Sequence, residues 1–151
     1  MIYVRHRLAI EFRNGAWLDE SRRSDTFEFL RENGFIYVCV DEPQGFKLSV
    51  PPVVEATSDV GMVRFHGRNR DNWEKKGISV AERFRYLYSH DELAEWLPKL
   101  AELASKTKEL HVMYVIARHK VPKQSHEQES SYGIASLHSQ RLWGEKCSRH
   151  G

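Results

Sequence analysis

The chain has 151 residues, of which 40% are hydrophobic and 29% charged, a composition typical of a globular domain with a buried core. Its 23 basic and 21 acidic residues are interspersed and give a formal net charge of +2, so no polybasic tract indicates a nucleic-acid or lipid-surface partner. No apolar run approaches the ~20 residues that span a bilayer, and residues 8–10 are too few for a secretory signal, so we expect a cytoplasmic protein without a membrane partner.

The N-terminal part of the chain predicts a strand, a helix and a second strand. Residues 8–12 are apolar and β-prone. Asp25 is suited to cap a following helix, with Glu28 three residues later, and Gly34 favours the end of that helix. Residues 35–40 (FIYVCV) are apolar almost throughout, as in a strand buried on both faces of a parallel sheet. This order is typical of a βαβ unit.

Two long connections follow, separated by a short strand. Residues 41–61 include several prolines and show no helical periodicity, and a connection of this length in a compact domain is usually functional or disordered. Residues 62–65 predict the next strand, and residues 66–77 form a second polar, glycine-containing connection. Both connections therefore begin where a predicted strand ends.

The clearest helix covers residues 90–105. Ser89 and Glu92 have the spacing of a capping box, and apolar side chains recur on one face of the helix. Pro98 removes one backbone hydrogen bond within this helix, so we expect a bend there. Residues 110–115 (LHVMYV) predict the last buried strand.

The character of the sequence changes after the last predicted strand. Residues 117–151 are polar with scattered apolar positions, which cannot bury enough surface to offset the entropy of ordering. We predict one domain over residues 1–116 and a disordered or weakly ordered tail over residues 117–151. Its histidines lack metal-ligand spacing, and Cys39 and Cys147 form no disulfide framework, so we predict no metal site. The residues identify no cofactor.

Four segments, in this order and spacing, resemble successive motifs of the YecE-like family, also called domain of unknown function 72. Single motifs of this kind are weak, but their ordered combination is specific, and the resemblance covers residues 7–114. The segments are AIEFRNGAWL (9–18), VDEPQG (40–45), VRFHGRN (63–69) and ERFRYLYS (82–89).

This resemblance implies an α/β protein with a TIM-type β/α barrel, which takes about 250 residues when complete. The chain is expected to supply the C-terminal half, as a partial barrel of about four strands with long loops at the C-terminal face. Residues 115–118 depart from the family pattern. Because an incomplete barrel exposes strand edges, we expect the chain to form a homo-oligomer, to capture a complementing N-terminal fragment, or to aggregate.

Polar residues at the carboxyl ends of the strands are the candidate site, as in other β/α barrels. We predict Glu11 and His66 as the catalytic pair, because a carboxylate and an imidazole can act as general acid and base. Arginine forks bind carboxylate or phosphate, so we expect a small anionic ligand, clamped mainly by Arg68. The predicted substrate-binding residues are Arg13, Asp41, Glu42, Arg64, Arg68 and Asn69.

Structural interpretations of the same residues carry equal weight. Glu11 can simply pair with Arg13 at the rim of the barrel. Asp41 can pair with Arg64 in the same way. Gly67 either lets a ligand approach the backbone or only makes a tight turn.

The aromatic residues are mostly expected in the core. Tyr86 and Tyr88 share a face of an extended segment, where core packing is favoured over lining a pocket. Trp96 lies on the apolar face of the long helix and is expected in the core as well. Trp73 lies in a connection rich in arginine and asparagine and is the one tryptophan expected near a ligand.

Three functional hypotheses follow. The first is an enzyme, or the remnant of one, that acts on a small anionic metabolite. The second is a non-catalytic binding module that uses its two long loops, and the third is an inactive gene fragment. The fold does not choose between them, because β/α barrels carry many unrelated activities.

Overall fold

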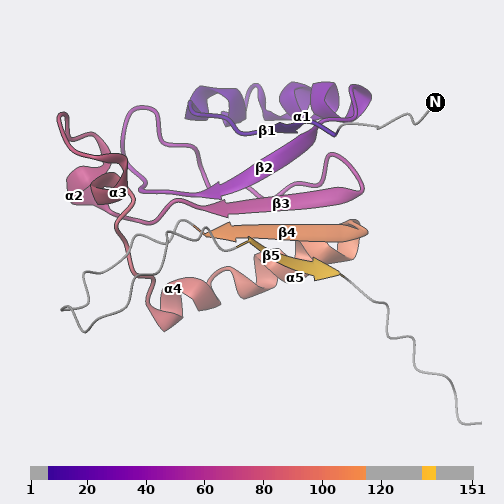
Figure 1. The fold of residues 1–151 in the computed structure, drawn as a ribbon. Helices are drawn as coiled ribbons and strands as arrows, with labels where there is room; N and C mark the ends of the chain where they lie inside the picture. The colour runs from indigo at the N-terminus through magenta and orange to yellow at the C-terminus, as the bar shows by residue number, and fades with distance from the viewer. Residues whose placement is uncertain (1–6, 115–133, 139–151) are drawn as a thin grey trace, which may run out of the picture.

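The computed structural model describes residues 7–114 and 134–138, and its strands form one open sheet in the order β1-β2-β3-β4-β5 (Figure 1). The first four strands are parallel, and β5 is antiparallel to β4. The fold is α/β, a partial TIM-type barrel as predicted. The strands are β1 (Ala9–Ile10), β2 (Ile36–Asp41), β3 (Val60–Phe65), β4 (Glu109–Tyr114) and β5 (Ile134–His138).

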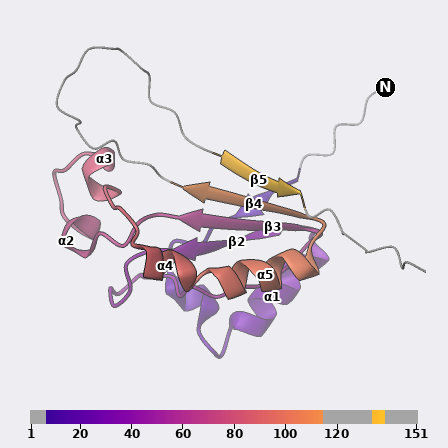
Figure 2. The same cartoon turned by 90° about the horizontal axis from the view of Figure 1, so that it is seen from below.

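The longer helices lie on one side of the sheet, as Figure 2 shows for α1, α4 and α5. Their bounds are α1 (Arg23–Glu32), α4 (His90–Ala94) and α5 (Leu97–Lys106). Short helices lie beyond the carboxyl ends of the strands: η1, a 3-10 helix (Gly15–Leu18), α2 (Arg70–Trp73) and α3 (Val80–Arg83). Helix α2 lies within residues 66–77, which were predicted to form a loop.

Successive side chains of β3 point alternately to the two faces of the sheet. Helix α5 covers one face, and the candidate site described below lies on the other. Phe65 packs on the buried Trp96, with ring centroids 5.0 Å apart. A Cβ on Gly61 would lie 2.9 Å from a side-chain carbon of Leu103, so α5 approaches the sheet closely there. Because successive side chains of a strand point to opposite faces, Arg64 lies on the face away from α5.

The connection after β2 returns along this strand without forming a helix, as predicted. The Thr57 hydroxyl accepts a hydrogen bond from the Tyr37 amide (2.8 Å) and donates one to the Phe35 carbonyl (2.7 Å). Farther along, the Tyr37 hydroxyl lies 3.4 Å from the Val53 carbonyl. These bonds attach an extended segment where a barrel usually has a helix.

Helix α1 begins earlier than predicted. Its N-cap position is Arg22, and no side chain caps the helix, so the predicted cap at Asp25 is wrong. Asp25 lies instead in the first turn, where a carboxylate interacts favourably with the helix dipole. The predicted end is confirmed: Gly34 has φ 66°, and the Phe35 amide donates to the Leu30 carbonyl (2.9 Å).

The helix predicted over residues 90–105 is divided into α4 and α5. The predicted capping box is present, because Ser89 and Glu92 exchange their hydrogen bonds. Pro98 lies at the N-terminal end of α5, where its missing N–H leaves no broken bond. The helix is therefore interrupted just before Pro98, and the predicted bend within a continuous helix is wrong.

Strand β5 differs from the predicted polar tail. Its residues pair antiparallel with β4, and Leu137 lies opposite Leu110. Backbone pairing with the open edge of β4 orders these five residues. The remainder of the predicted tail, and the domain boundary at residue 116, lie outside the described residues. Within the described ranges, no helix is long and apolar enough to cross a membrane.

The opposite edge of the sheet is bordered by an apolar groove of about 360 Å³ between β1 and α1. Trp17 and Phe29 line it and are 53% and 55% exposed. Strand β1 has only two residues and pairs with β2 alone. An apolar groove next to an unpaired strand edge is typical of a surface that binds another segment.

Candidate functional site

Four side chains from the ends of β1 and β3 meet in what we call the Glu11 cluster: Glu11, Arg13, Arg64 and His66. One Glu11 oxygen, Oε2, lies 2.8 Å from Arg64. The other, Oε1, lies 2.8 Å from Arg13 and 3.1 Å from His66 Nε2. These are four of the eight site residues predicted from the sequence, and the structural pairing of Glu11 with Arg13 is present.

The charges around Glu11 hold it in the ionised form. Burial by itself raises the pKa of Glu11, but hydrogen bonds and charge from His66 and Arg64 outweigh burial and lower it from 4.5 to about 2. Both carboxylate oxygens are occupied by nitrogen donors. Glu11 is therefore a fixed negative charge that holds two arginines and an imidazole in place.

This depressed pKa predicts a loss of stability in acid. The unfolded chain protonates Glu11 near pH 4.5 and the folded chain only near pH 2, so folding stability falls as the pH drops through this window. This pKa shift corresponds to a loss of about 3 kcal/mol in the free energy of unfolding. Urea unfolding of the wild type and of E11Q between about pH 6 and pH 2 measures it, because E11Q should lack this part of the acid dependence. Parallel curves for the two proteins would contradict the assignment.

His66 is held rigidly at the centre of the Glu11 cluster. Its side chain is 1% exposed, and its amide donates to the Asp41 carbonyl (2.8 Å). The ring lies 5.5 Å from the ring of Phe84 and 6.3 Å from that of Trp73. Nδ1 is the one buried side-chain polar atom within the described residues that lacks a hydrogen-bond partner. When Nε2 donates to Glu11, Nδ1 is left with a free lone pair.

A second set of polar side chains surrounds Asp41, on the helix-covered face of the sheet. Arg68 donates from Nε and Nη2 (2.9 to 3.2 Å), Tyr88 from its hydroxyl (2.6 Å) and Trp96 from Nε1 (3.0 Å). We call these four residues the Asp41 cluster. Asp41 is buried and fully bonded, and it does not pair with Arg64, contrary to the alternative considered from the sequence.

Arg68 and Asn69 are bonded to the protein itself. Besides Asp41, Arg68 contacts the carboxylates of Glu92 (3.7 Å) and Glu95 (2.9 Å). Asn69 donates to the carbonyl of Arg85 (2.8 Å) and so holds the segment after α3. An anion would have to displace carboxylates to reach Arg68, so the site offers better anion contacts elsewhere.

The geometry at Gly67 favours the tight-turn interpretation. Gly67 has φ 86°, and a Cβ there would lie 2.6 Å from the Cβ of Tyr86. Its amide donates to the Tyr88 hydroxyl (3.0 Å). The close approach that requires glycine is thus made by Tyr86. The two tyrosines pack with ring centroids 5.1 Å apart.

A cleft of about 400 Å³ opens next to the Glu11 cluster. Arg13 lines it with a side chain that is 55% exposed, and its guanidinium lies 5.9 Å from the ring centroid of Trp73. Trp73, the tryptophan that the sequence analysis expected near a ligand, lines this cleft. Two further cationic residues of the cleft, Lys76 and Arg83, were missed because neither lies at the carboxyl end of a strand, where the site residues were sought.

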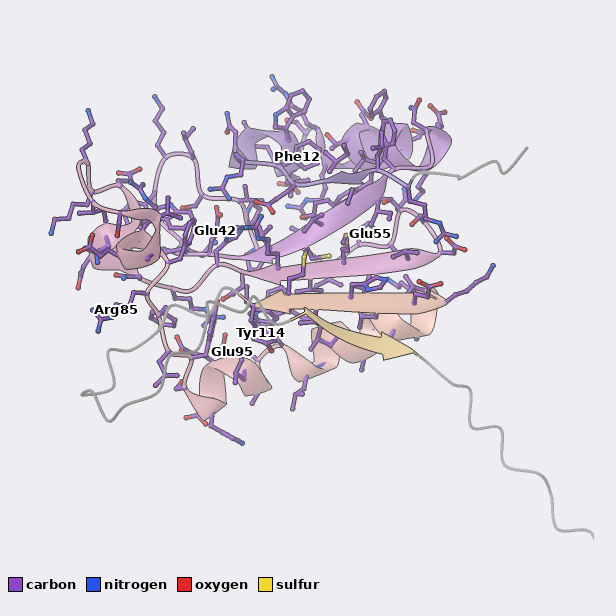
Figure 3. The ribbon with its side chains drawn as sticks, viewed as in Figure 1. Phe12, Glu42, Glu55, Arg85, Glu95 and Tyr114 are labelled. Carbon is purple, nitrogen blue, oxygen red and sulfur yellow. The ribbon has the colours of Figure 1, made fainter. Side chains whose placement is uncertain are left out.

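Glu42 lies at the carboxyl end of β2 and also lines this cleft (Figure 3). The residue is only 4% exposed, and its Oε1 accepts a hydrogen bond from the Val50 amide (2.7 Å). Burial raises the pKa of Glu42, and the Val50 hydrogen bond offsets this only in part. Glu11 and Glu42 therefore have oppositely shifted pKa values. Across residues 7–114 and 134–138, no group of His, Cys, Asp and Glu is placed to hold a metal ion.

Comparisons with known proteins all indicate the same family. A family model described as "Protein of unknown function DUF72" matches residues 3–137. The UPF0759 protein YunF of Bacillus subtilis (strain 168) is 38% identical over 110 residues, which are 70% of this chain and 39% of that protein. The chain thus spans about two fifths of the length of this curated relative.

Crystal structures of two bacterial proteins are also similar. A DUF72 family protein of Thermotoga maritima is 39% identical with a TM-score of 0.63, and the match covers 72% of this chain and 39% of that one. A DUF72 family protein of Enterococcus faecalis is 31% identical with a TM-score of 0.62, over 72% of this chain and 41% of that one. The names of these proteins assign no reaction.

Proposed function

Because the chain belongs to the DUF72 family, a family of unknown function, we propose a function from the site itself: the cleft beside the Glu11 cluster binds a small anionic ligand. The predicted family resemblance is confirmed. That the chain corresponds to the C-terminal half of the barrel stays a prediction, as does a cytoplasmic location.

The observation that carries this proposal is the half-exposed guanidinium of Arg13 in the cleft. Glu11 fixes Arg13 from one side, and the remaining N–H groups are available to a carboxylate or phosphate. Lys76 and Arg83 add positive charge to the lining, Arg83 while donating to the carbonyls of Trp73 and Lys75, and Trp73 supplies a flat apolar surface. A small oxyanion with an apolar portion fits this lining best.

The proposal changes the roles expected from the sequence. Arg13, Lys76 and Arg83 replace Arg68 as the anion contacts, because Arg68 already binds three carboxylates. Glu11 and Arg64 become positioning residues of the cluster. His66 is the acid–base candidate that remains, because its Nδ1 is unpaired.

A variant of Arg13 tests the proposal. We expect R13Q to raise the Kd for inorganic phosphate and for malonate about 10-fold to 100-fold, the loss of a charge-assisted hydrogen bond of about 1.5–3 kcal/mol. Trp73 in the cleft reports binding through its fluorescence. Added neutral salt should weaken binding to the wild type.

Arg31 provides a matched control, because it also forms an ion pair, with Glu55, but lies outside the cleft. R31Q should bind both anions like the wild type. Equal affinities of R13Q and wild type, or no binding of either anion to the wild type, would reject the proposal. Binding without turnover of any carboxylated or phosphorylated metabolite would favour the binding module over the enzyme.

A further inference from the structure

We propose that Glu42 faces the ligand as a neutral carboxylic acid and donates a hydrogen bond to the bound oxyanion, so that the cleft takes up an anion together with one proton. This inference rests on the proposed anion binding and adds the chemical state of the site. One O–H bond forms when a solvent species gives up a proton to the Glu42 carboxylate, and the ligand oxygen then accepts a hydrogen bond from this O–H group.

The carboxyl groups of Glu11, Asp41 and Glu42, at the ends of β1 and β2, differ in the number and charge of the hydrogen-bond donors around them. Glu11 is contacted by three side chains that carry nitrogen donors, and Asp41 by an arginine, a hydroxyl and an indole. For Glu42, the described residues supply one neutral donor, the Val50 amide, and no ion pair. A buried carboxylate with so little compensation is costly, whereas the protonated acid is not.

Burial raises the pKa of Glu42, and the charge of Glu11 adds to this effect. The Val50 hydrogen bond and the charges of His66 and Arg13 oppose it without cancelling it. A second negative charge brought into the cleft beside Glu42 raises the pKa further by Coulomb repulsion. Ligand binding and protonation of Glu42 therefore favour each other.

Other charged groups lie in or next to the same cleft. They include one imidazole, that of His66, and the experiment must separate its contribution from that of Glu42. Arg13 after β1 lines the cleft, together with Glu74 and Lys76 from the segment after α2 and Arg83 of α3, and Glu11 and His66 contact Arg13 within the Glu11 cluster.

The test uses sulfate, whose charge stays constant between about pH 5 and pH 8, so any proton exchanged belongs to the protein. The Kd of the wild type for sulfate should be flat below the pKa of Glu42 and rise about tenfold per pH unit above it. Calorimetry in two buffers of different ionisation enthalpy should show uptake of about one proton per sulfate on the steep part of this curve.

Two variants isolate the proposed donor. E42Q keeps a neutral donor and an oxygen for the Val50 amide, so its Kd should be independent of pH. E74Q removes another carboxylate of the same cleft and should keep the slope of the wild type. The carboxyl carbon of Glu42, followed by NMR, should shift to its protonated position when sulfate binds, and this readout does not depend on a variant folding.

The outcomes separate this inference from the proposed function. If sulfate binds with an unchanged proton count and a flat pH profile, or if E42Q keeps the slope, Glu42 is not the donor and anion binding still stands. If the Glu42 carboxyl signal stays at its ionised position in the complex, Glu42 is likewise not the donor. If the wild type binds neither phosphate, malonate nor sulfate, the anion cleft itself is wrong.

Discussion

D41N should lower the free energy of unfolding by about 4 kcal/mol, because it removes the charge of a buried ion pair and leaves the donors around it unmatched. Asp41 is 2% exposed, and Arg68, Tyr88 and Trp96 all donate to it. The asparagine amide offers one acceptor oxygen in place of two and turns an N–H₂ group toward these donors.

The control for this prediction is E95Q, which removes another carboxylate from the same arginine. Glu95 is exposed, so E95Q should cost less than about 1 kcal/mol. Urea unfolding of the two variants and the wild type, at equal protein concentration, measures both effects. Similar losses in D41N and E95Q would show that the Asp41 cluster does not stabilise the fold.

The open edge at β1 leads to the second large effect, a dependence of stability on a partner. We expect the part of the Bacillus subtilis relative that this chain does not match, added as a separate polypeptide, to raise the thermal midpoint by about 10 °C or more. The apolar groove beside β1 provides the surface, through exposed side chains such as Trp17 and Phe29. Without this partner, the chain should self-associate or aggregate.

Scanning calorimetry and sedimentation measure this effect. F29D places a charge in the groove and should abolish the gain in thermal midpoint. L87D makes the same change at an exposed leucine outside the groove and should keep the gain. A dilute wild-type chain that unfolds cooperatively as a monomer, and is unaffected by the added polypeptide, would show the prediction to be wrong.

The regular part of the fold was predictable because its signals are local. The apolar run in β2 and the capping box at Ser89 are short patterns with one physical meaning each. Ser79 and Glu82 form a second capping box, which also stands in the sequence and would have located α3. Strand β5 could not be predicted in this way, because its order comes from pairing with β4, far away in the sequence.

The candidate site was predictable to the same extent. The ends of parallel strands meet at one edge of a sheet, which is why Glu11 and His66 meet as expected. The partner of Asp41 was not predictable, because Asp41 lies opposite Phe65 and shares its face, while Arg64 points to the other face. Its donors Tyr88 and Trp96 come from segments that no short pattern connects to β2.

The backbone at residues 66–68 joins the two clusters, since His66 belongs to one and Arg68 to the other. The amides of His66 and Gly67 are both bonded, to the Asp41 carbonyl and to the Tyr88 hydroxyl. The turn is therefore ordered when the protein folds, and it fixes the position of the imidazole that lies 3.3 Å from Arg13 of the cleft. Binding at such a preorganised site loses little conformational entropy. Selectivity among ligands should then follow the shape of the cleft.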